Sequence, residues 1–281
     1  MKLTVLVDNN TLIDRYFIGE PGLSYLIEDE GTNILFDVGY SDAFLKNAGA
    51  MGLSLLDIDS VVLSHSHLDH TWGLVPLIKY YTEAAIEKRP FKRPAIVTHP
   101  MAFHSRRCDD IMEFGSMISK ESLSRHFEMK LSKEPVHLTD KLVFLGEIER
   151  NNDFEARTSI GKVVMGPDGN EEDDFMDEDS AMVYKSSRGL VVITGCSHSG
   201  ICNIVEQAKK VCREERIADI IGGFHLQEAP QDVLAGTLEY MKKINPEKIH
   251  ACHCTDLPAK IALAGVADLK EVGVGLTIEY K

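Results

Sequence analysis

The sequence predicts an α/β fold, because short apolar segments typical of β-strands alternate along the chain with longer segments typical of α-helices. The apolar share of 44% is ordinary for a globular core, and 281 residues suffice for one large α/β domain or two small ones. The alternation runs through both halves of the chain, although no sequence repeat relates them.

The expected strands are short and apolar, and the expected helices lie between them. In the first half, strands are expected over residues 3–7, 23–27, 33–37, 57–63 and 94–98, and helices over 41–51 and 69–88. In the second half, strands are expected over 181–185, 189–194, 218–221 and 248–252, and helices over 199–215, 230–244 and 258–264. Pro76 fits poorly inside the expected helix over residues 69–88, because proline disrupts helix interiors. Ser199 is the expected N-cap of the helix over residues 199–215. Residues 275–280 form the last expected segment of the chain.

Two stretches look inserted into this pattern. Residues 80–140 mix helical patterns with basic pairs, and residues 148–179 hold Gly161, Gly166, Pro167 and Gly169. The second stretch ends in an acidic run over residues 171–179, which we expect to be a solvated loop. A lid over a binding site is the alternative interpretation of this run.

Composition excludes some classes of partner. The net charge of −14 argues against nucleic acid, because phosphate binding needs a basic face. We expect no membrane-spanning helix, since no run of about 18 apolar residues occurs. Six cysteines do not form a disulfide framework, and the first residues do not form a signal peptide, so a cytoplasmic location is expected.

The strongest motif places His65, His67, Asp69 and His70 within six residues, between an expected strand and an expected helix. Imidazole and carboxylate groups are the ligands of catalytic zinc or iron sites, and a loop between two elements can turn them toward one point. The alternative is a solvated histidine-rich turn. The H-x-H-x-D-H order favours the metal site.

Further candidates follow other expected strands. Cys196 and His198 come directly after the strand over residues 189–194, and His198 is the clearer metal ligand of the two. Cys196 is either a thiolate ligand or a small buried residue. His225 is a ligand, a proton shuttle or a surface cap.

These segments together resemble the metallo-β-lactamase superfamily, over nearly the whole chain. The most similar branch is the one labelled 7,8-dihydropterin-6-methyl-4-(β-D-ribofuranosyl)aminobenzene-5′-phosphate synthase-like. The resemblance implies one domain over residues 1–281, folded as an αββα four-layer sandwich with two mixed β-sheets. It also implies two divalent metals, zinc in the first place, with iron or manganese as alternatives.

The resemblance assigns roles to individual residues. It implies that His65 and His67 hold the first metal and that Asp69 and His70 hold the second, with His253 as a further ligand of the second metal. Asp37 then orients the histidine loop through hydrogen bonds, whereas its position before Gly39 also suits a plain turn.

This chain departs from the superfamily pattern at two places. Cys196 stands where most members have an aspartate that bridges the metals. Residues 142–150 lack the histidine of the third motif, so either His198 or Glu147 supplies that ligand, or the site is different. Glu147 and Arg150 are alternatively expected to bind a polar or phosphorylated substrate. His99 and His104 are expected at the surface.

The favoured function is a metal-dependent hydrolase of a small, preferably phosphorylated, molecule. In that reading Asp69 also orients the nucleophile, and His225 or His198 protonates the leaving group. The alternative is a transferase that condenses a dihydropterin with ribofuranosylaminobenzene 5′-phosphate. The aromatic side chains of Phe103, Phe224 or Trp72 would then line a pocket for the flat ring. A redox or metal-sensing role for the cysteines is the third interpretation.

Overall fold

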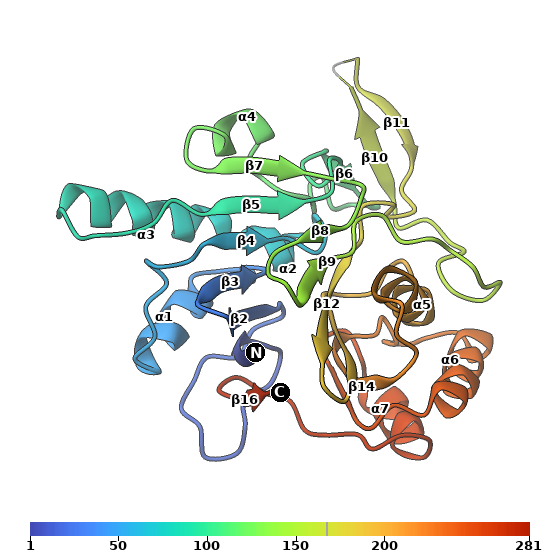
Figure 1. The fold of residues 1–281 in the computed structure, drawn as a ribbon. Helices are drawn as coiled ribbons and strands as arrows, with labels where there is room; N and C mark the ends of the chain where they lie inside the picture. The colour runs from blue at the N-terminus through green and yellow to red at the C-terminus, as the bar shows by residue number, and fades with distance from the viewer. Residues whose placement is uncertain (167) are drawn as a thin grey trace.

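The computed structural model describes residues 1–166 and 168–281 and shows two β-sheets packed face to face between outer helices (Figure 1). The first sheet has the strand order β16-β1-β2-β3-β4-β5-β7, and the second has the order β15-β14-β13-β12-β9-β8. Both sheets mix parallel and antiparallel pairs. The α/β prediction and the two-sheet sandwich are therefore confirmed.

Each main sheet collects strands from distant parts of the chain. The first comprises β1 (Lys2–Val7), β2 (Ser24–Asp29), β3 (Thr32–Phe36), β4 (Ser60–Val62), β5 (Ala95–Thr98), β7 (Glu128–Leu131) and β16 (Thr277–Glu279). The second comprises β8 (Val136–His137), β9 (Leu142–Phe144), β12 (Ala181–Ser186), β13 (Gly189–Thr194), β14 (Ile217–Gly223) and β15 (Ile249–Cys252). A small third sheet joins β6 (Arg106–Arg107), β10 (Lys162–Met165) and β11 (Asn170–Asp173).

Three apolar clusters hold the layers together. One lies between the two sheets, where Tyr25 and Phe36 belong to the same cluster as Phe144 and Ile193. A second lies under α1 (Ala43–Ala50) and α3 (Leu74–Ile86) on the first sheet. The third lies under α5 (Ile201–Cys212), α6 (Gln231–Ile244) and α7 (Leu257–Ala264) on the second. Burial of apolar surface on both faces of each sheet explains why the strands read as nearly continuous apolar runs.

The predicted helix over residues 69–88 is wrong, because it is divided into α2 (Leu68–Thr71) and α3. The chain turns at Gly73, where a Cβ atom would lie 1.9 Å from the carbonyl oxygen of Val38. Pro76 therefore falls in the first turn of α3, where its missing N–H costs no helical hydrogen bond.

The predicted cap of the helix over residues 199–215, which is α5 in the structure, is also wrong. The N-cap of α5 is Gly200, with φ of 92°, and the hydroxyl of Ser199 donates instead to the carbonyl oxygen of Asp179. The carboxylate of Glu155 accepts hydrogen bonds from the backbone N–H groups of Cys202 and Asn203. Glu155, from another segment, thus satisfies the free donors of the helix start.

The two stretches that looked inserted are built into the fold. Residues 80–140 supply β5 and β7 of the first sheet and the short helix α4 (Lys120–Leu123). Residues 148–179 supply the hairpin of β10 and β11, which projects from the body of the molecule (Figure 1). The expectation of a wholly solvated acidic run is wrong, because Asp174, Glu178 and Asp179 are buried.

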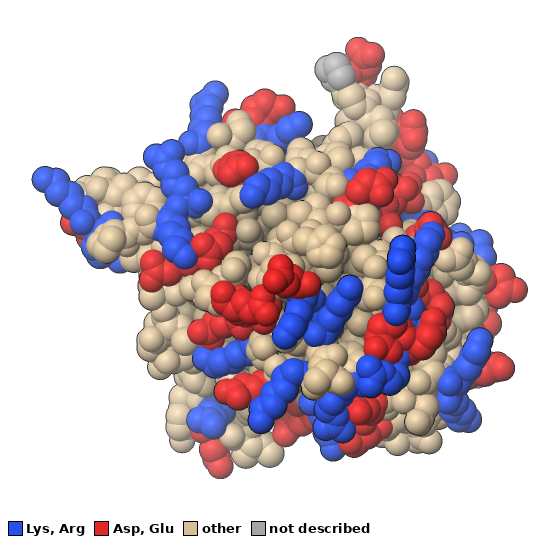
Figure 2. All heavy atoms as spheres, viewed as in Figure 1, with Lys and Arg blue, Asp and Glu red and all other residues tan. Residues whose placement is uncertain are grey.

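The surface agrees with the charge balance of the sequence. Acidic and basic side chains are intermingled on the face shown in Figure 2, unlike the continuous basic track that a nucleic acid needs. Among the described residues, no helix combines the length and the apolarity that crossing a bilayer requires.

Candidate metal centre

The candidate ligands meet at one edge because they follow the carboxyl ends of strands. Asp37 follows β3, and the histidine loop from His65 follows β4 in the first sheet. Cys196, His225 and His253 follow β13, β14 and β15, which are mutually parallel in the second. Parallel strands end at a common edge, so residues far apart in sequence become neighbours there.

Four ligand atoms converge in a first set, which we call the cysteine set and define as Asp69, His70, Cys196 and His253. His70 Nε2 and His253 Nε2 are 3.2 Å apart, and Cys196 Sγ lies 3.2 Å from each of them. Asp69 Oδ2 lies 3.2 Å from His253 Nε2 and 3.6 Å from His70 Nε2. Tetrahedral coordination at about 2.0–2.3 Å separates ligand atoms by roughly 3.3–3.8 Å, so this set fits a zinc-sized cation.

A second set, which we call the histidine set, comprises His65, His67 and His198. The ring centroids of these residues lie 4.6–4.8 Å apart. Within the part of the chain that the structure describes, their buried Nε2 atoms have no hydrogen-bond partner. Buried polar atoms are rarely left unpaired, so the unpaired Nε2 atoms of these three neighbouring rings fit a cation as their common partner. Cys196 also groups with His65 and His198, which places its thiol between the two sets.

Hydrogen bonds at Nδ1 turn several rings so that Nε2 faces the centre. His70 Nδ1 lies 2.7 Å from Asp37 Oδ2, and His253 Nδ1 lies 2.9 Å from Asn9 Oδ1. The hydroxyl of Ser64 donates to Asp37 at 2.7 Å, so it can only accept from His65 Nδ1 at 2.8 Å. Protonation at Nδ1 leaves the Nε2 lone pair free, which is the form that binds metal.

Burial sets the protonation of the histidine set. Burial lowers the pKa of His67 to about 3, and it lowers the pKa of His65 and of His198 well below the ordinary value. For His70, burial opposes protonation, but the carboxylates of Asp69 and Asp37 outweigh it and raise its pKa to about 9. Neutral imidazoles in the histidine set are ready to bind a cation without first losing a proton.

Burial acts in the opposite direction on two acidic groups. It raises the pKa of Asp179 to about 7, although the backbone N–H of Ser199 partly offsets the effect. It also raises the pKa of the Cys196 thiol well above its ordinary value, so a bound cation would be needed to hold a thiolate there.

A cavity of about 420 Å³ opens beside the histidine set. His198 and His225 line it, and their ring centroids are 4.3 Å apart. Phe154 and Phe224 contribute apolar wall, and Arg157 is the one guanidinium or ammonium side chain among the described residues that line the cavity. The volume suits a small molecule.

Comparison with known proteins decides the family. Residues 18–102, which contain the histidine loop, match the metallo-β-lactamase superfamily. A solved metal-dependent hydrolase of the β-lactamase superfamily has 26% sequence identity and a TM-score of 0.83, and the match covers 100% of this chain and 99% of that one. The chain belongs to the metallo-β-lactamase superfamily.

Two curated superfamily relatives come from Methanocaldococcus jannaschii. The chain is 29% identical over 274 residues to 7,8-dihydropterin-6-methyl-4-(β-D-ribofuranosyl)-aminobenzene-5′-phosphate synthase, a match that covers 92% of this chain and 89% of the relative. It is 28% identical over 262 residues to an uncharacterized protein, covering 93% of each chain. The likeness therefore extends beyond the metallo-β-lactamase motif to nearly the whole chain.

Two residues that we expected to bind substrate lie elsewhere. Glu147 pairs with Lys133 at 2.8 Å and with His99 at 3.2 Å. Arg150 pairs with Asp177 at 3.1 Å and donates to the carbonyl oxygen of Phe175. Neither belongs to the residues that line the cavity. The surface position expected for His99 is wrong, because the residue is buried against Glu147.

Sequence reasoning missed three residues that support the candidate ligands. Ser64 and Asn9 orient histidine rings, and Asp179 lies with Oδ1 4.0 Å from His65 Nδ1. The position of Ser64 directly before the motif was a usable signal. Asn9 and Asp179 had none, because they reach the site only through the folding of distant segments.

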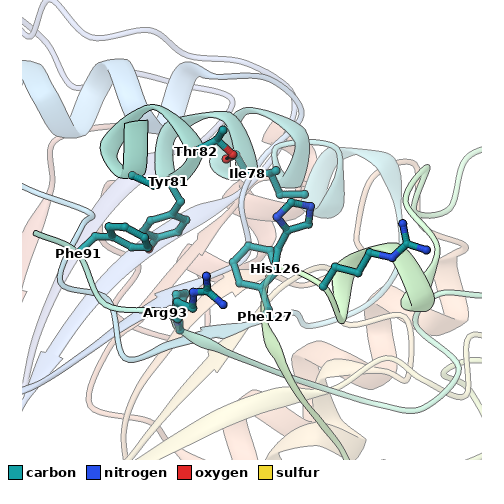
Figure 3. A pocket seen from close by; sticks show the side chains of 10 residues that line it. Ile78, Tyr81, Thr82, Phe91, Arg93, His126 and Phe127 are labelled. Atoms are coloured by element: carbon teal, nitrogen blue, oxygen red, sulfur yellow. Dashed lines mark hydrogen bonds between the residues drawn. The ribbon is translucent and has the colours of Figure 1, made fainter. Parts of the chain in front are cut away.

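A smaller pocket of about 100 Å³ lies apart from these ligands, beside α3 (Figure 3). Tyr81, Phe91 and Phe127 form its aromatic wall, and Arg93 and His126 stand at its side. Its lining includes no candidate metal ligand, so we assign no role in the chemistry to it.

Proposed function

We propose that this chain is a metal-dependent hydrolase that acts on a small molecule. The observation that carries the proposal is the grouping of buried ligand side chains at one sheet edge, where the cysteine set lies next to the group of His65, Cys196 and His198, directly beside a cavity that His198 lines. In the proposed assignment His65, His67 and His198 hold one divalent cation, and the cysteine set holds a second. Nitrogen, oxygen and thiolate donors in near-tetrahedral spacing favour zinc over iron or manganese.

The bound cations would polarise the substrate and lower the pKa of water from 15.7 to about 7. The protein groups then position the reactants. Asp69 keeps 23% of its side-chain surface exposed, so its carboxylate can both contact a cation and accept a hydrogen bond from an attacking water. Asp37 acts indirectly, because it holds the ring of His70 and the hydroxyl of Ser64.

His225 is the proposed proton donor to the leaving group. Its ring lies beside that of His198 in the cavity lining, and the residue is solvent-exposed. Its backbone N–H donates to Cys254 Sγ at 3.3 Å, which fixes the turn that presents the ring. A positioned imidazole of this kind contributes roughly 10²–10⁴-fold to a rate.

A phosphate-bearing substrate is the proposed class. Arg157 supplies a positive charge in a cavity that Asp153 and Asp232 also line, while Glu155 is occupied by the start of α5. Two divalent cations would add local positive charge, which offsets the acidic character of the chain as a whole.

A synthase is the second candidate, because the similarity to the dihydropterin synthase covers 92% of this chain. The aromatic side chains of Phe154 and Phe224 in the cavity wall suit a flat ring system. Incubation with a dihydropterin and a ribofuranosylaminobenzene phosphate, followed by mass spectrometry of the products, separates condensation from hydrolysis.

The first experiment measures metal content and hydrolysis together. Protein purified without chelator should contain two equivalents of metal and should hydrolyse at least one of p-nitrophenyl phosphate, bis-p-nitrophenyl phosphate and p-nitrophenyl acetate. His67→Ala should lose metal and activity, whereas His126→Ala, in the remote pocket, should lose neither. Metal retained in full by His67→Ala would refute the ligand assignment.

A further inference from the structure

The turn between the projecting hairpin and β12 bridges the two loops that carry the histidine set. Three consecutive residues, Glu178, Asp179 and Ser180, lie at this turn and are all fully buried. On one side they contact the loop of His65 and His67, and on the other side they contact the loop of His198. We call these three residues the clamp.

The contacts to the first loop come from both ends of the clamp. Glu178 Oε1 accepts a hydrogen bond from the Ser66 hydroxyl at 2.8 Å, and Ser66 stands between the two histidines of the loop. The backbone N–H of Ser180 donates to the carbonyl oxygen of Ser64 at 2.9 Å. The loop is thus held by its backbone and by the side chain at its centre.

The contact to the second loop comes from Asp179. Its Oδ2 accepts from the backbone N–H of Ser199 at 2.8 Å, and its carbonyl oxygen accepts from the Ser199 hydroxyl at 3.2 Å. Ser199 directly follows His198. Asp179 therefore controls where the third ligand of the histidine set stands relative to the first two.

A buried arginine holds the clamp in place. Arg106 Nε lies 2.8 Å from Asp174 Oδ2, and Arg106 Nη2 lies 2.8 Å from Glu178 Oε1. The arginine side chain is fully buried and also donates to the carbonyl oxygens of Met101 and His104. Because paired buried charges are costly to separate, this network fixes the clamp rather than letting it drift.

The cysteine set is supported by different residues. Asp37 holds His70, while Asn9 and Asp8 hold the ring and the backbone N–H of His253. No hydrogen bond recorded for the described residues joins Glu178 or Asp179 to the cysteine set. The two sets share one link, because Asp37 also accepts a hydrogen bond from the Ser64 hydroxyl, which contacts His65. Of the two sets, Glu178 and Asp179 contact only the loops of the histidine set, so their removal should weaken that set selectively.

We propose that Glu178 and Asp179 are positioning residues that fix the spacing of His65 and His67 from His198 and thereby determine the affinity of the histidine set for its cation. This inference rests on the metal centre proposed above. Removal of a residue that orients a metal ligand typically weakens binding about 10–100-fold. The loss should fall on one cation only.

The test compares metal binding in four proteins. Asp179→Ala removes the acceptor for Ser199, Asp179→Asn keeps an acceptor oxygen at the same place, and Glu172→Ala removes an exposed carboxylate from the same acidic run. Each protein is titrated with a chelator of graded strength, and the metal that remains is counted. Cobalt substitution adds a second readout, because the thiolate-to-cobalt absorption band of Cys196 reports whether the cysteine set is filled.

We expect Asp179→Ala to release one of two metals about 10–100-fold more readily while the thiolate band persists. Asp179→Asn should recover most of the affinity, and Glu172→Ala should behave as the unaltered protein. Three results would each overturn the proposed role of the clamp. They are equal loss of both metals, unchanged metal affinity in Asp179→Ala, and a metal affinity in Asp179→Asn that is no higher than in Asp179→Ala. If the unaltered protein itself binds fewer than two metals, the proposed centre fails instead.

Discussion

Gly195 lies so close to Ser64 that a Cβ atom on the glycine would stand 2.1 Å from the serine hydroxyl oxygen. The same Cβ atom would stand 3.1 Å from Asp37 Oδ2. Gly195 directly follows β13 of the second sheet, whereas Ser64 and Asp37 belong to loops of the first. The two halves of the metal centre can therefore meet only because this position has no side chain.

Gly195→Ala should disrupt the centre through this contact. We expect a loss of stability of about 1–3 kcal/mol, as for overpacked sites, together with weaker metal binding because Ser64 is pushed away from His65. Denaturant unfolding and metal analysis measure the two effects. Gly49→Ala is the matched control, since a Cβ atom there meets nothing within 4 Å. Normal metal content in Gly195→Ala would show that the contact is not required.

Asp37→Asn should weaken the cysteine set without unfolding the protein. The carboxylate accepts hydrogen bonds from the Ser64 N–H, the Ser64 hydroxyl and His70 Nδ1. In the asparagine variant an amide NH₂ group would face one of these donors, so that hydrogen bond would be lost. We expect metal affinity to fall about 10–100-fold in a chelator competition. Asp42→Asn, an exposed carboxylate paired with Lys46, should leave the affinity unchanged. Equal affinities in the two variants would contradict the role of Asp37.

Arg106→Met should destabilise the protein strongly. The change leaves the buried carboxylates of Asp174 and Glu178 without their common cation, which costs about 3–5 kcal/mol in comparable buried pairs. Arg107→Met is the control at the next position, where an exposed pair with Glu171 is worth about 0–1 kcal/mol. Urea unfolding of both variants gives the comparison. Similar midpoints for the two would show that the buried network contributes little.

Cys196→Ser should change the spectrum of the cobalt-substituted protein. The thiol lies 3.2 Å from both His70 Nε2 and His253 Nε2, so a thiolate-to-cobalt absorption band is expected in the unaltered chain and should vanish in the variant. Cys108→Ser, which is not among the clustered ligands, should keep the band. A band that survives in Cys196→Ser would place another thiol, such as Cys254, at the metal.

His225→Asn should separate metal binding from catalysis. Asparagine tolerates the left-handed backbone that His225 adopts, with φ of 51°, so the turn should persist. We expect full metal content and a turnover number reduced about 10²–10⁴-fold. The measurement is steady-state kinetics on whichever probe ester the enzyme hydrolyses. Loss of metal in this variant would mean that His225 is a ligand rather than a proton donor.

The local pattern of the chain was sufficient for the fold type and for much of the candidate centre. Alternation of apolar strands with helices predicts an α/β fold, because each apolar segment must be buried against another layer, and the resemblance to the superfamily implied the sandwich. His65, His67, Asp69 and His70 lie within six residues, so their proximity needs no knowledge of the fold. Cys196 was found because it directly follows a buried strand, and the resemblance to the superfamily pointed to His253 after a later strand.

Only the tertiary structure decided which side chains support the centre. Ser66 and Glu178 are 112 positions apart and Asn9 and His253 are 244 apart, yet each pair forms one hydrogen bond. No local periodicity encodes such pairs, because they depend on how two sheets and their loops pack together. The same reason explains why Arg150 is not among the residues that line the cavity and why the acidic run is partly buried. The sequence by itself determined the ligand chemistry, and the packing of the two halves decided its geometry.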